Sequence, residues 1–280
     1  MKLVMTLLVR DEDDILAANL DFHLSRGVDF FVVTDNLSVD GTRDILARYE
    51  ALGVLKYLYQ AEDDYSQHRW VTHMARMAAS EFGADWVINN DADEFWWPEQ
   101  GDLKQVLSKV PTHLDAVSAA RTNFVSRSME SGDFFADAMT LRETRSTNDL
   151  GKPLPSKAAH RGFADIEVQQ GNHRVFRMGE KIKPGPVPIS ILHFPRRSYR
   201  RFANKIAKGG AAYERNTELV PGAGGAWRHL HGLWKEGRLE ANYRQYVVDD
   251  RRAAEGLAEG RYVLDERLKA ALAALAALAS

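Results

Sequence analysis

The sequence predicts an α/β fold with a mostly parallel, Rossmann-like central sheet, flanked by helices and followed by a helical C-terminal extension. In residues 1–100, short apolar runs alternate with amphipathic stretches, which is the pattern of consecutive strand–helix units. Acidic clusters follow three of the apolar runs, at residues 10–14, 35–40 and 91–94. Because the carboxyl ends of parallel strands meet at one edge of a sheet, these clusters are expected to lie together there.

The first four strands and three helices are expected to alternate along the chain. Residues 3–9 form an apolar run that only Thr6 interrupts, as in a buried strand. The helical stretches carry apolar residues on one side, and the first of them ends at Gly27. The expected strands span residues 3–9, 28–34, 54–59 and 85–90, and the expected helices span residues 13–25, 40–51 and 67–82.

The pattern changes after residue 115. A strand is expected at residues 116–125, followed by a region rich in Gly, Pro, Asn and charge with short strands near 163–168 and 173–176. A further strand at 189–194 precedes a basic helix, which Ser198 caps and the Gly209-Gly210 pair is expected to end. The predicted domains are residues 1–210, with halves 1–125 and 126–210, and a helical extension over residues 211–280.

Composition narrows the function classes. The chain has 280 residues, enough to bury a core, and its 45% hydrophobic and 27% charged residues are typical of a globular protein. A formal net charge of -2 gives no global attraction to nucleic acid, and no nucleic-acid-binding motif is present. The chain has no cysteine, which excludes disulfides and thiolate metal sites.

Neither a signal peptide nor a membrane span is expected. Acidic residues follow the first apolar run at once, and no stretch approaches the roughly 20 apolar residues of a membrane span. These observations predict a cytoplasmic protein, and they leave peripheral contact with the inner face of the membrane open. The leucines of the C-terminal stretch form an amphipathic stripe. Packing on its own domain, homo-oligomer formation and membrane-surface attachment are the three roles considered for it.

The segment Asp91-Ala92-Asp93 is the most informative acidic turn. It places two carboxylates on alternate residues at the end of an expected strand. Hard divalent cations such as Mg²⁺ and Mn²⁺ take carboxylate, water and phosphate oxygens as ligands. Two carboxylates this close also repel each other, which favours a bound cation. Taken alone, however, such a turn is at least as typical of a solvated acidic loop as it is of a metal site.

Three segments in order resemble bacterial family-2-like glycosyltransferases of the GT-A fold. They are the Arg10-Asp11-Glu12 turn, the turn DNLSVDGT at residues 35–42, and DADEF at residues 91–95. Asp11 stands where that family often has Asn. The resemblance covers residues 1–100 and continues more loosely through SKAAHR, GNHRVF and LHFPRRSYRRFANK. It implies a GT-A-type fold, with residues 1–125 as the nucleotide-binding half and residues 126–210 on the acceptor side.

The resemblance also implies roles for individual residues. Val9, Arg10 and Glu12 would lie beside the nucleotide base, and Asp35 would contact the base or the ribose. Asp91 would face the ribose and diphosphate and share a divalent cation with Asp93, the main metal ligand. The residues of the DNLSVDGT turn after Asp35 are interpreted as structural. Among them, Asp40 is expected to cap the second helix and Gly41 to permit a tight turn.

A histidine from the C-terminal half often completes the metal shell in such enzymes. His193 and His173 are the candidate ligands, and His160 is interpreted as substrate-lining or structural. Glu94 is the candidate catalytic base beside Asp93, with a role as partner of the metal or of an arginine as the alternative. The aromatic residues that follow Glu94 suit either a sugar-stacking surface or a core plug.

The basic helix supplies candidate phosphate ligands. Arg201, Lys205 and Lys208 recur at helical spacing, and Lys205 is the residue assigned to the donor diphosphate. A phosphorylated lipid-linked acceptor is a second possible partner of this face, and a solvated surface is the alternative. Lys157 and Arg161 form a smaller basic group, which is a further candidate for binding phosphate.

The function predicted from these observations is metal-dependent transfer of a sugar to an acceptor hydroxyl. The donor is a nucleoside-diphosphate sugar, with a UDP-sugar favoured, and the cofactor is Mn²⁺ or Mg²⁺. The resemblance suggests a hexosyltransferase-like enzyme acting on a carbohydrate or glycolipid precursor of the bacterial surface. The main alternative is a non-catalytic nucleotide- or carbohydrate-binding protein on the same fold. A sugar-1-phosphate nucleotidyltransferase is disfavoured, because the first turn lacks a Gly-rich phosphate loop.

Overall fold

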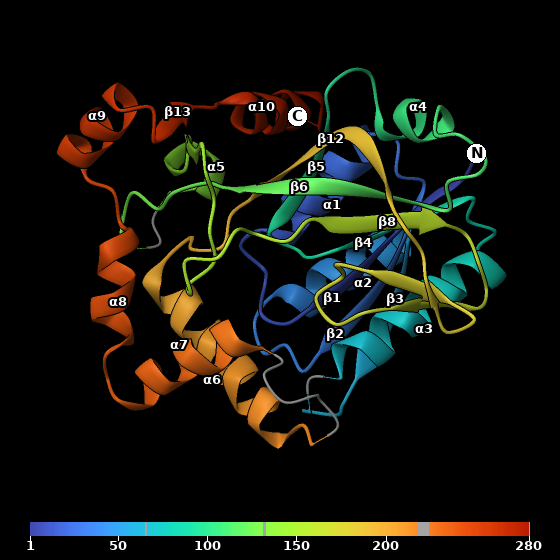
Figure 1. Cartoon of the computed structure of the whole chain (residues 1–280), viewed down its shortest axis with the longest axis horizontal. Coiled ribbons are helices and arrows are strands. Elements are labelled where there is room, and N and C mark those ends of the chain that lie inside the picture. The colour runs from blue at the N-terminus through green and yellow to red at the C-terminus, as the bar shows by residue number, and fades with distance from the viewer. Residues whose placement is uncertain (65, 131–132, 218–223, 280) are drawn as a thin grey trace. The chain divides into compact units, whose positions relative to one another are not determined.

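The structure, a computed structural model, describes residues 1–64, 66–130, 133–217 and 224–279 (Figure 1). Two compact units are present, each assembled from separate stretches of the chain. The first comprises Met1–Ala61, Ser66–Arg121 and Pro155–Leu192, and the second comprises Glu62–Tyr65, Thr122–Leu154 and His193–Ser280. These units divide the chain at other positions than the expected domains, residues 1–210 and 211–280. Within the described residues, no helix is both long and apolar enough to cross a membrane.

The first unit is built on a large mixed sheet. Its N-terminal half contains β1 (Leu3–Val9), α1 (Leu16–Ser25), β2 (Phe30–Asn36), α2 (Thr42–Ala51), β3 (Leu55–Gln60), α3 (Gln67–Ser80) and β4 (Trp86–Asn90). Its later elements are β5 (Glu94–Pro98), α4 (Leu103–Ser108), most of β6 (Ala116–Asn123), β8 (Lys157–Arg161), β9 (Ile166–Val168), β10 (Val175–Arg177), β11 (Glu180–Lys181) and most of β12 (Gly185–His193).

The strand order in this sheet is β3-β2-β1-β4-β8-β6-β12-β5. β1 pairs in parallel with both β2 and β4, and β2 pairs in parallel with β3, whereas β8 is antiparallel to β4 and β6. The expected α/β fold with a mostly parallel sheet at its centre is confirmed. The chain runs outward from β1 in both directions, so the order switches between β1 and β4, the place where such sheets bind ligands.

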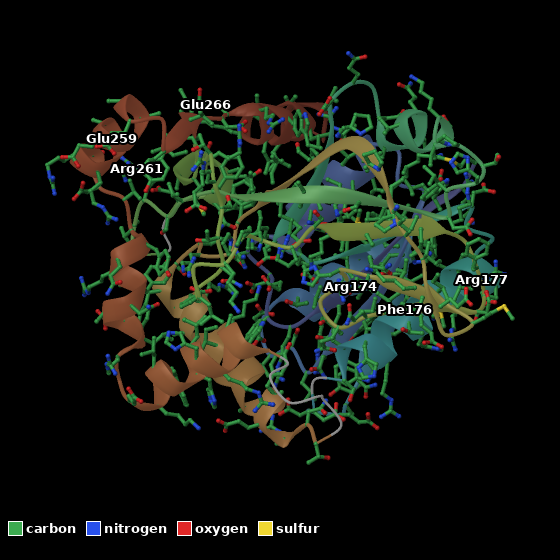
Figure 2. The ribbon with its side chains drawn as sticks, viewed as in Figure 1. Arg174, Phe176, Arg177, Glu259, Arg261 and Glu266 are labelled. Carbon is green, nitrogen blue, oxygen red and sulfur yellow. The ribbon has the colours of Figure 1, made fainter. Side chains whose placement is uncertain are left out.

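The core explains why the N-terminal strands are so apolar. On one face of the sheet, Val4, Val32 and Val87 pack with α3 residues such as Met74. The alternate residues of β1 are buried as well, including Leu3, Met5 and Leu7 at 0% exposure. Because successive side chains of a strand point to opposite faces, both faces of β1 are covered. A small three-stranded sheet, β11-β10-β9, also belongs to this unit, and its Phe176 and Arg177 are labelled in Figure 2.

The strand β5 was not expected from the sequence. It follows the acidic turn directly, and its Phe95 and Trp96 are both 0% exposed. The backbone N–H of Trp96 donates to Nε2 of His23 at 3.1 Å, and its indole N–H donates to Asn90 Oδ1 at 3.0 Å. Of the two roles considered for these aromatic residues, the structure shows the core plug for Phe95 and Trp96.

The second unit is mainly helical. Its elements are α5 (Phe135–Ala138), β7 (Leu141–Glu143), α6 (Tyr199–Arg215), α7 (Gly225–Lys235), α8 (Leu239–Tyr246), α9 (Asp250–Ala258), β13 (Tyr262–Leu264) and α10 (Arg267–Ala279). One apolar cluster joins Phe202 and Ile206 of α6 to Leu230 of α7 and Tyr243 of α8. In α10, Leu268 and Leu272 are buried, as expected for packing on its own unit, while Leu278 is 86% exposed.

The expected end of the basic helix at Gly209-Gly210 is wrong. Ser198 caps α6 as predicted, with its side chain accepting from the Arg201 N–H, but the helix continues to Arg215. A Cβ at Gly209 would lie 2.5 Å from Trp227 of α7, and a Cβ at Gly210 would lie 2.3 Å from His231. These glycines therefore allow two helices to approach closely, and they do not stop the helix.

Candidate functional site

The turns that follow β1 and β2 are hydrogen-bonded to each other. The Asp11 N–H donates to Ser38 Oγ at 2.9 Å, and the Val39 N–H donates back to Asp11 Oδ1 at 2.8 Å. The Glu12 N–H donates to Thr42 Oγ1 at 2.9 Å. These bonds confirm that the DNLSVDGT turn has a structural part to play, because its polar side chains satisfy the backbone of the neighbouring turn.

Two residues of these turns adopt left-handed backbone conformations that side chains other than glycine rarely take. They are Asp11, with φ of 56°, and Leu37, with φ of 62°. Asp40 Oδ1 accepts from the Thr42 N–H at 3.0 Å, at the first residue of α2, but the N-cap residue of this helix is Gly41 and the helix has no side-chain cap of the expected kind. Strained turns of this kind persist where the surrounding hydrogen bonds fix them, and they are common at functional sites.

The residues expected to bind the nucleotide lie together at this edge of the sheet. Val9 is the register partner of Asp35 across β1 and β2, and Arg10 and Glu12 follow Val9 directly. Val9, Glu12 and Asp35 are buried, and Arg10 is half-buried. The structure therefore brings the four residues to one place, while their contact with a nucleotide stays a prediction.

Asp35 is held more tightly than the sequence suggested. Its side chain is fully buried, with Oδ1 accepting from the Ser38 N–H at 3.0 Å. Its Oδ2 accepts from Arg43 Nε at 3.1 Å and from the Tyr57 hydroxyl at 3.3 Å. Both carboxylate oxygens thus already accept hydrogen bonds from neighbouring groups. In this structure Asp35 fixes the turn after β2.

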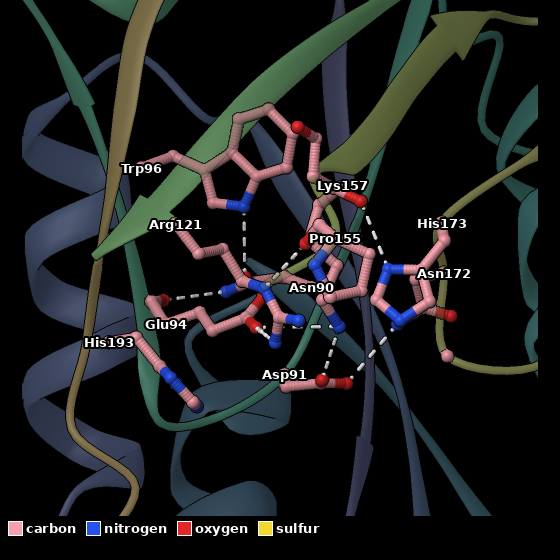
Figure 3. Close-up of polar contacts among 12 residues, drawn as sticks. Asn90, Asp91, Glu94, Trp96, Arg121, Pro155, Lys157, Asn172, His173 and His193 are labelled. Carbon is pink, nitrogen blue, oxygen red and sulfur yellow. Dashed lines mark hydrogen bonds and ion pairs between the residues drawn. The ribbon is translucent and has the colours of Figure 1, made fainter. Parts of the chain in front are cut away.

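The acidic turn after β4 carries the second half of the site (Figure 3). Asp91 is 31% exposed, and its Oδ2 lies 2.5 Å from the ammonium Nζ of Lys157. Its Oδ1 accepts from Asn172 Nδ2 at 3.1 Å. Asp93 is 3% exposed. Two different parts of the chain therefore hold the Asp91 carboxylate in one orientation.

Glu94, the residue that follows Asp93, joins the same network. It is fully buried, and its Oε1 lies 2.9 Å from Arg121 Nη1 and 3.4 Å from Lys157 Nζ. Burial, the largest effect, raises the pKa of Glu94 above its usual value. The positive charges of Lys157 and Arg121 act in the opposite direction, while the nearby carboxylates of Asp91 and Asp93 raise the pKa of Glu94 further. With no exposed surface, the carboxylate is not accessible to an acceptor hydroxyl here. This geometry favours the alternative role for Glu94, as partner of a cation, over that of base.

Strand pairing explains why Lys157 meets this turn. In the antiparallel β4–β8 ladder, Ile88 pairs with Ala159, and continuing that register places Lys157 opposite Asn90. Lys157 is also the register partner of Ala119 in β6, two residues before Arg121. The side chain of Lys157 is only 1% exposed. A buried ammonium needs partners of opposite charge, and Asp91 and Glu94 provide them.

His173 lies at the same end of β8. Its Nδ1 is 2.9 Å from the Ser156 carbonyl oxygen, so Nδ1 carries the proton and Nε2 carries the lone pair. Burial lowers the pKa of His173 to about 3, helped by the positive charges of Lys157 and Arg121. The imidazole is therefore neutral at physiological pH, which is the form that binds metals. Gly171, with φ of 82°, leaves room for its ring.

The remaining predicted residues, His193 and Lys205, belong to the second unit. His193 Nδ1 lies 2.8 Å from Asn123 Oδ1, and Lys205 is half-buried on α6. Their assignment to the metal and to the diphosphate stays a prediction. His160 is fully buried, its Nδ1 lies 2.8 Å from the Arg161 carbonyl oxygen, and burial lowers its pKa to about 4. These features favour the structural interpretation of His160.

The residues around the acidic turn carry donor atoms suited to a divalent cation, but they do not form a complete coordination shell. Within the described residues, no three His, Asp or Glu side chains converge on one point as metal ligands. Two buried oxygens of the network, Glu94 Oε2 and Asn172 Oδ1, have no hydrogen-bond partner in the part of the chain that the structure describes. Hard oxygen donors beside a neutral imidazole suit Mg²⁺ or Mn²⁺, provided that the substrate supplies further oxygens.

Sequence reasoning missed three members of the network. Arg121 and Asn172 were not singled out, and Lys157 was noted only as part of a small basic group. The one signal was the loose resemblance in SKAAHR and GNHRVF, the segments that contain Lys157 and Asn172. Their roles depend on pairing between distant strands, which local patterns do not reveal.

No protein-family model and no curated protein matches the sequence. Solved structures similar to the chain include TarS of S. aureus in complex with UDP, at 13% identity and a TM-score of 0.45, covering 79% of this chain and 67% of that one. A mannosyltransferase of Pyrobaculum calidifontis in complex with GDP-Man and Mn²⁺ has 18% identity and a TM-score of 0.39, covering 99% and 80%. Glucosyl-3-phosphoglycerate synthase of Mycobacterium tuberculosis in complex with Mn²⁺, UDP and glucosyl-3-phosphoglycerate has 14% identity and a TM-score of 0.32, covering 43% and 44%. Similarity at this level does not identify the activity of this chain.

Proposed function

We propose that this protein is a metal-dependent glycosyltransferase that moves a sugar from a nucleoside-diphosphate sugar to an acceptor hydroxyl. The observation that carries the proposal is the position of the acidic turn. Asp91 and Asp93 follow β4 directly, beside the switch in strand order, and the turn containing Arg10 and Glu12 follows the neighbouring strand β1. Nucleotides bind at this place in open α/β sheets.

Each group has a defined part in the proposed reaction. Arg10, Glu12 and Val9 receive the base, and Asp91 faces the ribose and diphosphate. Asp93 and Asp91 would hold Mn²⁺ or Mg²⁺ with help from His173, and the ion, when bound, neutralises charge on the diphosphate leaving group. His193 as a metal ligand and Lys205 as a phosphate ligand remain proposals that rest on the sequence.

The finer assignments rest on the resemblance of the three turns to family-2-like enzymes. They are a UDP-sugar donor, a hexosyl group, and an acceptor that is a carbohydrate or glycolipid precursor of the bacterial surface. A protein acting there would be cytoplasmic, with peripheral contact at the membrane.

Donor turnover tests the proposal. The protein is incubated with UDP-, GDP- and CDP-sugars and Mn²⁺, and release of the nucleoside diphosphate is followed with and without simple sugar acceptors. We expect release from one donor class, loss of release with EDTA, and loss in Asp93→Asn. Asp133→Asn, at an exposed position, is the matched control and should turn over normally. Metal-dependent binding of a nucleotide without any turnover would instead identify the non-catalytic binding protein.

Glu94→Gln separates the two roles of that residue. If Glu94 is the base, kcat falls strongly, the acidic limb of the pH profile disappears, and nucleotide binding is retained. If Glu94 instead orients Lys157 and Arg121, nucleotide and metal binding weaken together with kcat. The buried position of Glu94 leads us to expect the second result.

A further inference from the structure

We propose that Asn19 and His23, two buried polar residues of α1, are positioning residues that fix the backbone on both sides of Asp93. They lie four residues apart, and therefore on one face of the helix, and both are 0% exposed. Neither residue was singled out from the sequence. This inference rests on the proposed function, in which the acidic turn that contains Asp93 takes part in the reaction.

The amide group of Asn19 holds the acidic turn directly. Its Nδ2 donates to the Ala92 carbonyl oxygen at 2.9 Å and to the Glu94 carbonyl oxygen at 2.8 Å. These two residues precede and follow Asp93. The Glu94 carbonyl also accepts from Asn90 Nδ2 at 3.0 Å. Because a carbonyl group cannot turn without the rest of its planar peptide unit, these bonds fix the peptide planes before and after Asp93.

His23 determines which way round the Asn19 amide lies. The backbone N–H of Trp96, in β5, donates to His23 Nε2 at 3.1 Å, so the ring proton is on Nδ1. This Nδ1 donates to the Asn19 carbonyl oxygen at 2.8 Å and to Asn19 Oδ1 at 3.0 Å. With Oδ1 of Asn19 turned toward His23, the Nδ2 of Asn19 is left to face the carbonyls of Ala92 and Glu94.

The first turn of α1 is tied to the other part of the proposed site. The N–H groups of Ile15 and Leu16 donate to the Glu12 carbonyl at 3.1 and 2.9 Å, and the Asn19 N–H donates to the Ile15 carbonyl at 2.9 Å. The helix therefore starts on the turn proposed to receive the nucleotide base, and it reaches the acidic turn one helical turn later. Because an α-helix has a fixed rise per residue, α1 sets the spacing between the two turns.

The polar character of Asn19 and His23 supports a positioning role over a purely stabilising one. Other buried residues of α1, such as Leu16, Leu20 and Phe22, are apolar. A buried amide or imidazole loses its hydration, so even complete hydrogen bonding leaves it a small net contribution to stability. What a satisfied buried network does provide is a single, well-defined backbone conformation.

The test replaces Asn19 by leucine, which has nearly the same size and lacks both amide donors. Hydrogen–deuterium exchange, followed by mass spectrometry, reports on the backbone of residues 91–97 without any ligand. In Asn19→Leu we expect this segment to exchange at least about tenfold faster, while β1 exchanges as in the wild type. Because a misplacement of about 1 Å can lower a rate about a hundredfold, we expect kcat with saturating donor and Mn²⁺ to fall by a factor of about 10 to 100.

Met74→Ala is the matched control for a general loss of stability. Met74 is 0% exposed and packs in the core between α3 and the sheet. At a temperature where circular dichroism shows both variants folded, Met74→Ala should keep wild-type kcat and wild-type exchange in residues 91–97. If Met74→Ala lowers kcat as much as Asn19→Leu does, lost stability accounts for the effect and the inference is overturned.

A second pair of variants serves in case Asn19→Leu does not fold. His23→Leu removes the acceptor of the Trp96 N–H and the donor to Asn19, whereas the amide oxygen of His23→Gln can still accept from Trp96. We expect faster exchange in residues 91–97 and a lower kcat in His23→Leu, and partial recovery of both in His23→Gln. Wild-type exchange or wild-type kcat in a folded Asn19→Leu or His23→Leu would overturn the inference.

The inference and the proposed function fail in different ways. If the wild type turns over a nucleotide-sugar and a folded Asn19→Leu turns it over equally fast, the inference is removed and the transferase is kept. If the wild type neither binds a nucleotide nor turns over a donor, while Asn19→Leu speeds exchange only in residues 91–97, Asn19 still holds the acidic turn and the transferase is removed.

Discussion

At the scale of single residues, the buried charges around the acidic turn dominate the site. Glu94 links Arg121 and Lys157, and Lys157 links Glu94 to Asp91. Asp91 and Asp93 could be singled out from the sequence because they are separated by one residue and follow a recognisable strand. Their cationic partners were not, because Arg121 and Lys157 lie far away in sequence and resemble ordinary surface charges until the strands pair.

Replacing Glu94 should reveal how much this network contributes to stability. Glu94→Gln leaves Arg121 and Lys157 with less compensation in a buried place, so we expect the free energy of unfolding to fall by about 3 kcal/mol. Glu259→Gln is the matched control, since Glu259 pairs with Arg261 at the surface and should cost less than about 1 kcal/mol. Urea unfolding measures both, and equal effects would show that the buried network is not a stabilising feature.

Two buried histidines away from the acidic turn should make stability depend on pH. Burial lowers the pKa of His23 to about 3 and that of His160 to about 4. Both are neutral in the folded protein, so their contribution is complete above the unfolded pKa near 6.5 and is lost as the pH falls toward the folded values. Each should lower the free energy of unfolding by about 1.4 kcal/mol per pH unit below 6.5.

Urea unfolding between pH 7 and pH 5 measures this dependence. The comparison variant is His160→Gln, which removes one of the two groups and should make the decline with falling pH visibly shallower. The assignment to His160 is contradicted if the variant and the wild type lose stability in parallel over this range.

At the scale of elements, the first four strands were predicted well, whereas β5, β8 and the end of α6 were not. β2, β3 and β4 begin and end within two residues of the expected ranges. Apolar runs mark β2 and β4, which are almost wholly buried, whereas β3 is an edge strand in which only Leu55 is buried. The end of α6 was mispredicted, because a Gly-Gly pair looks the same in the sequence whether it ends a helix or leaves room for a second helix to pack closely. Only the contact with α7 distinguishes the two cases.

Two glycine substitutions separate these meanings. Gly210→Ala in α6 adds a Cβ that would lie 2.3 Å from His231, so it should destabilise the protein by about 1–3 kcal/mol despite the higher helix propensity of alanine. Gly232→Ala in α7 meets nothing within 4 Å and should stabilise by about 0.5–1 kcal/mol. Thermal or urea unfolding reports both signs, and a stabilising Gly210→Ala would contradict the close approach of the two helices.

At the scale of the whole molecule, the fold class could be predicted from the sequence and the division into units could not. The alternating strands and helices of the N-terminal half indicate a parallel sheet, because each element can be recognised from its local sequence pattern. Each compact unit, however, collects separate stretches of the chain, and the second joins residues 122–154 to residues 193–280. Such a division depends on long-range packing, such as the antiparallel pairing of β7 with β13. Nothing in the sequences of these two strands indicates that they pair.

Truncation tests the observed division against the one expected from the sequence. A chain ending at residue 210 removes α7 and α8, which supply Leu230 and Tyr243 to the cluster around Phe202 and Ile206 of α6. We therefore expect residues 1–210 to be insoluble, or to lose the sharp unfolding transition of the full chain. A truncated protein that unfolds as cooperatively as the full chain would support the expected boundary instead.

The most direct test of the central claim is metal-dependent binding of a nucleotide at the acidic turn. Thermal unfolding is followed with UDP, GDP and CDP, each with and without Mn²⁺, for the wild type and for Asp93→Ala. A ligand at a hundred times its dissociation constant stabilises the native state by about 2.7 kcal/mol, which is readily detected. The account predicts a shift with one nucleotide that requires Mn²⁺ and disappears in Asp93→Ala. No shift with any nucleotide, in the presence or absence of metal, would contradict it.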